Sequence, residues 1–445
     1  MNKMMINNIY RKFNHFMTFV LVNIVKMFKI VIKKMLNMTL FQLLWFSLVF
    51  IVIIVIWTRG NVNEVIVPKA ANYPVILWWT PNFPGSSGLT NCSNLKCYVY
   101  SDRKKASNPA GAYLFYASGM NFDDLPLPRR PKDVIWGLFH EESPRNVEEL
   151  LHEQALSLFN FSSTFSRFSD VPFPLQYLHK FDDIITRKYF VATSVKKEFL
   201  ENNAPIMYLQ SDCSTSTERD EYVKDLMKYI KVDSYGGCLK NRDIPAILQE
   251  DYLNNLNEDG ILKFIARYKF VIAIENGVCS DYVTEKFWRA IKVGSIPIYF
   301  GSPSIKDWFP NNKSAILLKD FPTPKILAQH IDNLINNDSL YEGYLEHKTR
   351  QIVTNNKLLN ELRMRPYQLD GLNSVREFEC YVCKKLHDKT NGKTDLAIVN
   401  KSHYDCPKPL SALTLNVNPG NSWVSSWELA EVKVKELYKA IIDGY

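Results

Sequence analysis

Residues 270–301 read FVIAIENGVCSDYVTEKFWRAIKVGSIPIYFG, and this segment has the complete pattern of a strand–helix–strand unit. The runs at 270–274 and 296–300 are short and apolar, as expected of buried parallel strands. Between them, an apolar residue recurs every four positions and predicts the buried face of a helix: Val283, Phe287 and Ile291. We therefore expect a strand, a polar loop, a helix and a second strand of a parallel sheet.

The ends of this helix also have sequence signals. Ser280 or Asp281 can cap its start, and Gly294 can end it. The loop before it leaves the carboxyl end of a strand, where open α/β sheets bind ligands. It carries three polar side chains to that edge: Glu275, Asn276 and Asp281.

Glu285 and Lys286 fall in the first turns of the predicted helix. Free backbone N–H groups there favour a phosphate, and an ammonium beside them can pair with its charge. This pattern suits a nucleotide diphosphate. Capping acids and a surface lysine also occur in any strand–helix–strand unit, and that alternative stays open on the pattern alone.

Other apolar runs of strand length extend the pattern in both directions. Such runs lie at 75–79, 134–139 and 189–194 in the first half, and at 229–236 and 315–318 in the second. Together with the helical stretches between them, they predict two α/β units. The polar segment 202–217 is interpreted as a loop that contains the domain boundary. Residues 392–426 are rich in Asn, Pro and Ser, and are interpreted as a loosely structured tail before a final helix at 427–442.

The net charge of +8 does not indicate a nucleic-acid-binding protein. Residues 1–39 contain seven Lys and Arg and no acidic residue, so the rest has 47 basic against 46 acidic side chains. A sustained basic face for a phosphate backbone is therefore not expected.

The uncharged run at 40–57 is long enough to cross a bilayer as a helix. It lacks a small-residue cleavage site, so we favour an uncleaved anchor over a signal peptide. The positive charges precede it, which predicts a cytosolic N-terminus and type II topology. The apolar segment 13–32 is broken by Lys26 and Lys29 and is interpreted as a membrane-surface helix.

Eight cysteines in a luminal chain suggest disulfides, whose pairing the sequence does not give. A zinc site is the alternative for one group of side chains: Cys380, Cys383, His387, His403 and Cys406. Glycosylation sequons at five asparagines fit the same compartment: Asn91, Asn160, Asn312, Asn337 and Asn400.

The stretch 270–301 closely resembles the signature of the α1,3-fucosyltransferase family, glycosyltransferase family ten. The matching positions are Glu275-Asn276, Asp281-Tyr282-Val283-Thr284-Glu285-Lys286, Ala290, Gly294, Pro297 and Gly301. The resemblance covers roughly residues 75–385. It implies two Rossmann-like domains facing a cleft (GT-B type), with GDP-fucose held by the C-terminal domain. It further implies an inverting reaction without a metal ion or other cofactor, and the sequence has no Asp-x-Asp triplet.

Two further segments resemble family motifs. Arg219 matches the arginine that holds the donor pyrophosphate, and its planar fork suits two phosphate oxygens. Asp212 stands where that motif usually has asparagine. Arg167 lies in an altered version of a third motif, so a structural role is as good an interpretation as a functional one.

On the acceptor side, Glu142 follows a predicted strand and matches the glutamate of the family's Glu-Ser-Pro, the proposed general base. Glu141 is its rival, because adjacent residues of an extended segment point in opposite directions. Three tryptophans could stack on a sugar, although a core position is the commoner use of such residues: Trp78, Trp79 and Trp136. The paired glutamates and the long C-terminal extension resemble the divergent branch represented by fucosyltransferases ten and eleven.

The sequence thus predicts a membrane-anchored fucosyltransferase of the Golgi or endoplasmic reticulum. Its donor-binding residues would be Arg219, Glu275, Asn276, Asp281, Tyr282, Glu285 and Lys286. Its acceptor would be an N-acetylglucosamine hydroxyl of a glycan, or a Ser or Thr of a folded disulfide-rich domain. The alternatives are a related transferase with another nucleotide sugar, and a catalytically silent luminal lectin or folding factor.

The predicted order of segments follows from these interpretations. It comprises a cytosolic basic segment (1–39), a transmembrane signal-anchor (40–57), a stem (58–72), an acceptor-side domain (73–205), a GDP-fucose-binding domain (206–385) and a C-terminal extension (386–445).

Overall fold

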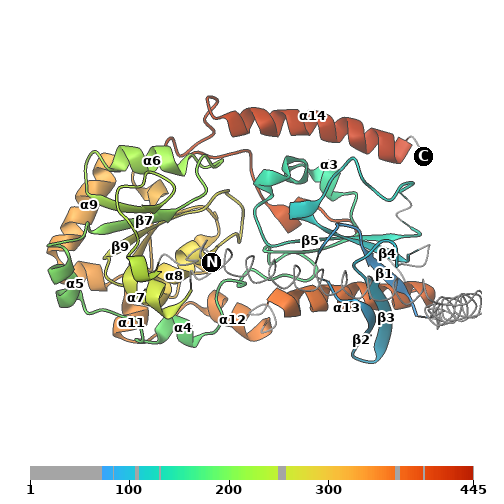
Figure 1. Ribbon diagram of the computed structural model, residues 1–445, viewed down its shortest axis with the longest axis horizontal. Helices are drawn as coiled ribbons and strands as arrows, with labels where there is room; N and C mark the ends of the chain where they lie inside the picture. The colour runs from blue at the N-terminus through green and yellow to red at the C-terminus, as the bar shows by residue number, and fades with distance from the viewer. Residues whose placement is uncertain are drawn as a thin grey trace, which may run out of the picture. The chain divides into compact units, whose positions relative to one another are not determined.

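The computed structural model describes residues 73–83, 85–105, 110–129, 132–248, 257–365, 371–393 and 396–443. From Tyr73 onward the chain is one compact unit that contains two β-sheets, which Figure 1 shows as two separate groups of strands. Helices pack on both sheets. This is an α/β fold of the GT-B-like type, with a Rossmann-like sheet in each half.

The first sheet has six strands in the order β2-β3-β1-β4-β5-β6. β2 pairs antiparallel with β3, whereas the other neighbouring strands are parallel. Its strands are β1 (Val75–Trp78), β2 (Gly88–Cys92), β3 (Leu95–Tyr100), β4 (Ala112–Tyr116), β5 (Ile135–His140) and β6 (Phe161–Thr164).

The second sheet has five strands in the order β11-β10-β9-β7-β8, and every neighbouring pair is parallel. Its strands are β7 (Ile206–Gln210), β8 (Val232–Gly236), β9 (Phe270–Ile274), β10 (Ile296–Phe300) and β11 (Ile316–Leu317). All five residues of β9 are buried, so the sheet is covered on both faces there.

The α-helices connect and cover these strands. They are α3 (Glu153–Leu156), α4 (Asp182–Ile185), α5 (Thr193–Phe199), α6 (Arg219–Leu226), α7 (Asp259–Ile265), α8 (Glu285–Val293), α9 (Pro324–Asn336), α10 (Asp338–Glu342), α11 (Glu346–Thr349), α12 (Asn356–Met364), α13 (Gly371–Thr390) and α14 (Ser422–Asp443). Short 3₁₀ turns lie at η1 (Ala117–Gly119), η2 (Pro144–Asn146), η3 (Glu148–Leu151), η4 (Ala246–Leu248), η5 (Ile305–Asp307), η6 (Leu318–Asp320) and η8 (Lys401–Tyr404).

The strands predicted at 270–274 and 296–300 are confirmed to the residue as β9 and β10. The buried helix face is confirmed as well, and Gly294 ends α8 in the left-handed region at φ 71°. The predicted cap was wrong. Thr284 caps α8, and its side chain accepts a hydrogen bond from the Lys286 backbone N–H.

Two other interpretations of the sequence were wrong. Residues 189–194 form no strand and lead into α5, because their apolar side chains pack on the core without joining a sheet. The polar segment 202–217 contains β7, which lies between β8 and β9 in the second sheet. The apolar part of β7 is short and its flanks are polar, so the strand is masked in the sequence pattern. The predicted domain bounds remain predictions, and α13 packs on strands of the first sheet.

All eight cysteines form disulfides, which confirms the preferred interpretation over a zinc site. The pairs are Cys92–Cys380, Cys97–Cys383, Cys213–Cys238 and Cys279–Cys406. Two of them fasten α13 to the hairpin of β2 and β3. The sequon asparagine Asn160 is buried, and its side chain bonds Arg129 and the backbone of β5, so it is not accessible in the folded chain.

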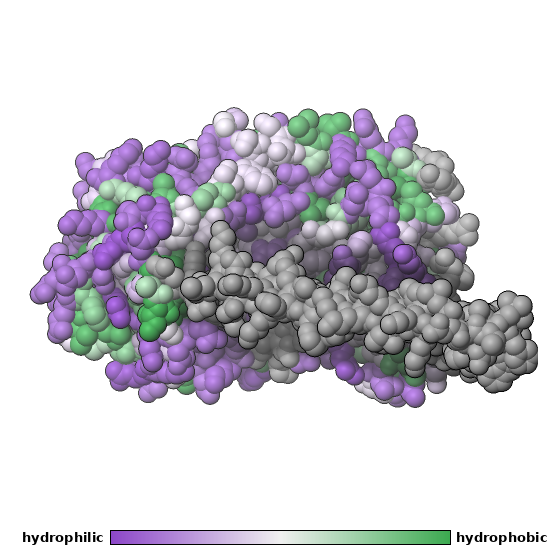
Figure 2. All heavy atoms as spheres, viewed as in Figure 1, coloured by the Kyte–Doolittle hydropathy of each residue, from purple (hydrophilic) through white to green (hydrophobic). Residues whose placement is uncertain are grey.

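The membrane prediction has to be corrected. Within the ranges that the structure describes, no helix is both long and apolar enough to cross a bilayer. The two longest, α13 and α14, carry charged residues along their length. Figure 2 shows hydrophilic side chains over most of the visible described surface, with hydrophobic ones in small separate areas. The predicted single-pass type II topology, with its Golgi or endoplasmic reticulum membrane localisation, thus finds no membrane-spanning helix among the described residues. The predicted segments 1–39, 40–57 and 58–72 lie outside the described residues.

Candidate active site

Glu275 follows β9 directly and is fully buried at the carboxyl edge of the second sheet. Its carboxylate accepts hydrogen bonds from the backbone N–H of Thr284 at 2.8 Å and from the Thr284 hydroxyl at 2.7 Å. Because Thr284 caps α8, these bonds fix where the helix begins relative to the strand. Glu275 therefore shapes the loop between β9 and α8.

Lys286 lies beside two carboxylates in the first turn of α8. Its Nζ is 3.1 Å from Glu285 and 3.6 Å from Glu275. Burial raises the pKa of Glu275 to about 7. Burial also opposes the charge of Glu285, but attraction by Lys286 and Arg289 outweighs it and lowers the pKa of Glu285 to about 2. Although burial disfavours its charge, the two acids raise the pKa of Lys286, so this side chain is a cation.

Arg219 is the first residue of α6, and only 1% of its surface is exposed. Its guanidinium donates to the backbone carbonyls of Ile274 at 3.3 Å and Asp212 at 2.5 Å. It thus lies between the end of β9 and the loop after β7. Its charge also acts on Lys286, whose pKa it pushes downward, so the two predicted phosphate-binding cations share one electrostatic environment.

Asp281 is buried and adopts a positive φ of 68°. Its carboxylate accepts from Arg167 at 2.6 and 2.9 Å and from the Ser304 hydroxyl at 2.6 Å. Burial opposes ionisation, but these hydrogen bonds outweigh it and lower the pKa of Asp281. The guanidinium of Arg167 also contacts Asp307 at 3.1 Å. Arg167 therefore joins the loop after β6 to the second half of the molecule. The carboxylate of Asp281 accepts its hydrogen bonds from side chains of the protein itself.

Asn276 connects two loops of the site. Its Oδ1 accepts from the Ser143 hydroxyl at 2.9 Å, and its backbone carbonyl accepts from the Ser216 hydroxyl at 2.8 Å. Ser143 belongs to the predicted acceptor-side motif and Ser216 to the loop before α6. The sequence-predicted motifs, far apart along the chain, thus meet at Asn276.

Glu142 and Glu141 follow β5 and contact different groups. Oε2 of Glu142 accepts a 2.6 Å hydrogen bond from the phenol of Tyr282, and Oε1 lies 3.4 Å from the phenol of Tyr177. Glu141 instead accepts from Tyr116 of the first sheet at 2.5 Å, and burial raises the pKa of Glu141. Of the two acids, Glu142 is the one that contacts residues 270–301, which we call the donor segment.

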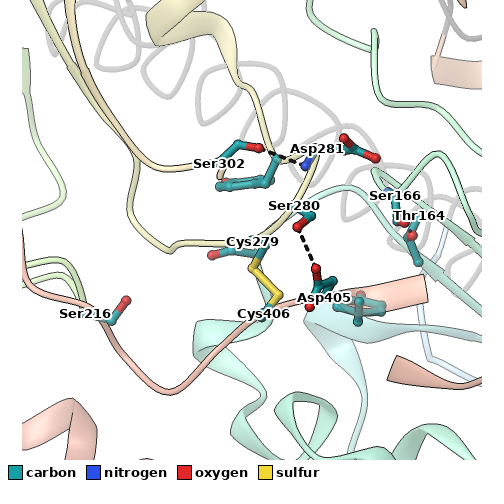
Figure 3. Close-up of a disulfide and its surroundings, with 12 residues drawn as sticks. Thr164, Ser166, Ser216, Cys279, Ser280, Asp281, Ser302, Asp405 and Cys406 are labelled. Atoms are coloured by element: carbon teal, nitrogen blue, oxygen red, sulfur yellow. Dashed lines mark hydrogen bonds between the residues drawn. A yellow bond between two sulfur atoms is a disulfide. The ribbon is translucent and has the colours of Figure 1, made fainter. Parts of the chain in front are cut away.

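The residues around 402–423 cross this site, and we call them the C-terminal strap. Near its start, the Tyr404 phenol bonds the ring of His140, the last residue of β5. Burial lowers the pKa of His140 to about 3, so the ring is neutral at physiological pH. Figure 3 shows the next contacts, the Cys279–Cys406 disulfide and the 2.6 Å hydrogen bond from Ser280 to Asp405.

Further along, the strap bonds the loop before α6. The backbone N–H of Ala412 donates to the Thr217 carbonyl at 2.8 Å, and the Asn421 side chain donates to the Ser216 carbonyl at 2.9 Å. The indole of Trp423 donates to the Ser214 carbonyl at 3.1 Å. The strap therefore contacts the carboxyl edges of both sheets. The prediction of a loosely structured tail at residues 392–426 was wrong. Its polar composition suggested solvent exposure, whereas three of its polar side chains bond other loops: Asp405, Asn418 and Asn421. Cys406 was a signal of attachment in the sequence.

The tryptophans have mainly structural positions. Trp78 and Trp136 are 0% and 1% exposed, so the core interpretation is confirmed for them. Trp79 is partly buried, with the guanidinium of Arg103 3.9 Å above its ring.

Sequence comparison agrees with this geometry. Residues 71–176 match the fucosyltransferase N-terminal domain, and residues 200–401 match the C-terminal domain of glycosyltransferase family 10 (fucosyltransferase). The chain is 39% identical over 381 residues to human GDP-fucose protein O-fucosyltransferase 3, a match that covers 82% of this chain and 79% of that protein. The chain belongs to glycosyltransferase family 10. The family resemblance of the donor segment is thereby confirmed, and this chain is a glycosyltransferase of the fucosyltransferase type.

Another family 10 relative is alpha-(1,3)-fucosyltransferase B of Drosophila melanogaster, 40% identical over 380 residues, with 82% of this chain and 84% of that protein covered. Among solved structures, an alpha1,3-fucosyltransferase with GDP aligns with 71% of this chain and 92% of its own, at 14% identity and a TM-score of 0.42.

Proposed function

We propose that this family 10 enzyme transfers L-fucose from GDP-fucose to a hydroxyl group of a glycoprotein, with inversion at the anomeric carbon. The observation that carries the proposal is the contact of Glu142 with Tyr282. It brings an acid of the acceptor-side motif to the segment that matches the family's donor signature. The printed names of the human and fly relatives, one of which contains GDP-fucose, support this donor and this reaction.

The donor diphosphate would be held by Lys286 and Arg219, as the family resemblance implies. Lys286 stays cationic in its buried position in α8, and the guanidinium of Arg219 donates to the carbonyl of Ile274 at the end of β9. These charges would offset the negative charge that develops on GDP as it leaves. A divalent metal is therefore not needed in the proposed reaction.

In the proposed step, the acceptor oxygen attacks the anomeric carbon of fucose from the face opposite GDP. Its proton passes to the carboxylate of Glu142, the new glycosidic C–O bond forms, and the bond to the β-phosphate oxygen breaks with its electron pair leaving on GDP. Glu141 is not suited to this role, since it faces Tyr116 in the first sheet.

For the acceptor, we favour a Ser or Thr of a folded, disulfide-rich protein domain over a free oligosaccharide. The name of the human relative refers to protein O-fucosylation, and that of the fly relative to α1,3-fucosylation. The strap supports the first choice, because it adds an extended C-terminal segment beside the acceptor-side motif. An N-acetylglucosamine hydroxyl of a glycan is the second candidate.

The test is a transfer assay with the purified full chain in the presence of chelator. GDP-fucose, GDP-mannose and UDP-N-acetylglucosamine would each be offered with folded disulfide-rich domains and with free lactosamine. We expect transfer from GDP-fucose to the folded domain. Preferred use of another nucleotide sugar would refute the donor assignment, and a need for added manganese would refute the metal-free mechanism. Transfer to lactosamine alone would refute the protein acceptor.

A further inference from the structure

Arg145 lies three residues after Glu142, in the turn η2, and no sequence motif had marked it as a site residue. Its Nη2 donates to the carboxylate of Asp212 at 2.6 Å, which joins the acceptor-side loop to the loop after β7. The ring of Trp423 in the strap lies 5.5 Å from its guanidinium carbon. The side chain is 13% exposed, and its Nε is buried with no hydrogen-bond partner among the described residues.

Arg219 is a second arginine that contacts the Asp212 carboxylate. Its Nη2 lies 3.6 Å from the Asp212 carboxylate, and its Nε is also buried without a partner within the described part of the chain. Two guanidinium groups thus share a single carboxylate. Buried donors without partners are uncommon in folded proteins and cost free energy. The cluster therefore has both charge and hydrogen-bonding capacity for a further anion.

A small pocket lies beside this cluster. Its lining includes Ser143, Arg145, Ser216, Gly277 and Trp423. The acceptor-side loop, the loop before α6, the loop between β9 and α8, and the strap therefore all contribute to it. Its volume is about 20 Å³, which accommodates about one water molecule. A phosphate group cannot be added there as the pocket stands. It would reach Arg145 in place of the Asp212 carboxylate, whose side chain is 49% exposed and can turn towards solvent.

We propose that Arg145 is a third cation that binds the donor diphosphate, and that Asp212 is an internal anion that the diphosphate displaces. The inference rests on the proposed function, since it assigns a further residue to that same donor site. A diphosphate carries more negative charge than one carboxylate and offers more acceptor oxygens, so it can satisfy both arginines at once.

The exchange would couple donor binding to the acceptor side. Arg145 and Glu142 belong to one short loop, in which Pro144 restricts the backbone between them. When the diphosphate binds Arg145, it draws this loop towards the donor and positions Glu142. The Asp212 carboxylate then competes with the donor diphosphate for Arg145 in the empty enzyme.

The experiment measures GDP affinity of the purified full chain by calorimetry, in chelator, for the wild type and three variants. Arg145→Gln should weaken GDP binding by roughly tenfold, because a charge-assisted contact is lost. Asp212→Asn should strengthen it by a few-fold, because the internal competitor loses its charge. The control is Arg103→Gln, since Arg103 also pairs with an aspartate at 2.6 Å and contacts a tryptophan ring, away from the site. The control should bind GDP as the wild type does.

Thermal unfolding would establish that each variant is folded. If Arg145→Gln does not fold, Arg145→Lys retains the charge without the planar fork and should weaken GDP binding by a few-fold. Unchanged affinity in Arg145→Gln would overturn the proposal, and so would an Asp212→Asn variant that binds GDP as weakly as Arg145→Gln does. Failure of the wild type to bind GDP would instead refute the proposed donor, and the inference with it.

Discussion

The phenol of Tyr282 donates a 2.6 Å hydrogen bond to Oε2 of Glu142. The two residues are 140 positions apart in the sequence, on the donor segment and on the acceptor-side loop. Burial, followed by the nearby Glu142 charge, raises the pKa of Tyr282 well above its usual range, so the phenol remains a donor at physiological pH. The hydrogen bond therefore holds the Glu142 carboxylate in one orientation.

Removing this hydrogen bond should slow turnover. We expect Tyr282→Phe to lower kcat by about tenfold with little change in KM for GDP-fucose, because a positioning contact worth about 1.5 kcal/mol is lost. Tyr177→Phe is the matched control, since its longer 3.4 Å contact with Glu142 should contribute less. Steady-state kinetics of the two variants provide the check. Equal losses would show that Tyr282 has no special role.

Lys286 should be important for donor binding. Replacing it by alanine removes a charge-assisted contact to phosphate, on the order of 2 kcal/mol, and should weaken GDP binding at least roughly tenfold. Lys292 lies on the same helix and pairs with Asp183 at 3.2 Å, so Lys292→Ala is the control and should leave GDP affinity unchanged. Calorimetry with GDP distinguishes the two, and an unaffected Lys286→Ala would remove this residue from the donor site.

The donor segment could be predicted well from sequence because its information is local. The apolar runs of β9 and β10 and the stripe of α8 each follow from a few neighbouring residues. The cap of α8 was misplaced for a non-local reason. Thr284 takes that position because Glu275 accepts from both its backbone N–H and its hydroxyl.

The rest of the site depends on contacts between distant residues. The bond from Tyr404 to His140 and the disulfide between Cys279 and Cys406 join segments with no common pattern in the sequence. An even number of cysteines indicated disulfides without their pairing. Polar composition suggested a solvated tail, because a sequence does not show whether a polar side chain bonds water or another loop.

Loss of the Cys279–Cys406 disulfide should lower activity more than loss of the Cys92–Cys380 disulfide does. We expect the double variant Cys279→Ser/Cys406→Ser to lower kcat/KM for GDP-fucose by tenfold or more, because the donor loop loses its attachment to the strap. The control double variant, Cys92→Ser/Cys380→Ser, breaks a disulfide between β2 and α13. Each pair closes a long loop, so each loss should cost about 2–5 kcal/mol of stability. Transfer assays well below both unfolding temperatures are the measurement. An equal loss of activity in the control would contradict this role of the strap.

The buried carboxyl group of Glu275 should make the free energy of unfolding depend on pH. The folded chain raises the pKa of its carboxyl to about 7 by burial, whereas the unfolded chain titrates near the usual 4.5. Between these values the folded state binds more protons, so the stabilisation is complete below pH 4.5 and is lost as pH rises to 7. The change should be roughly 2–3 kcal/mol. Glu275→Gln, which mimics the neutral acid, should lack it. Denaturant unfolding at pH 5 and pH 7.5 measures the difference, and an identical loss in both proteins would exclude Glu275 as its source.

Glu142 is proposed to accept the proton from the attacking hydroxyl, and a pair of glutamine variants tests this role. Glu142→Gln should bind GDP-fucose normally by calorimetry, yet lose roughly a hundredfold or more in kcat, because no proton acceptor remains. Glu141→Gln, one residue away with its hydrogen bond to Tyr116, should retain most of its turnover. Near-normal turnover of Glu142→Gln, with collapse in Glu141→Gln, would contradict the account and assign the proton to Glu141.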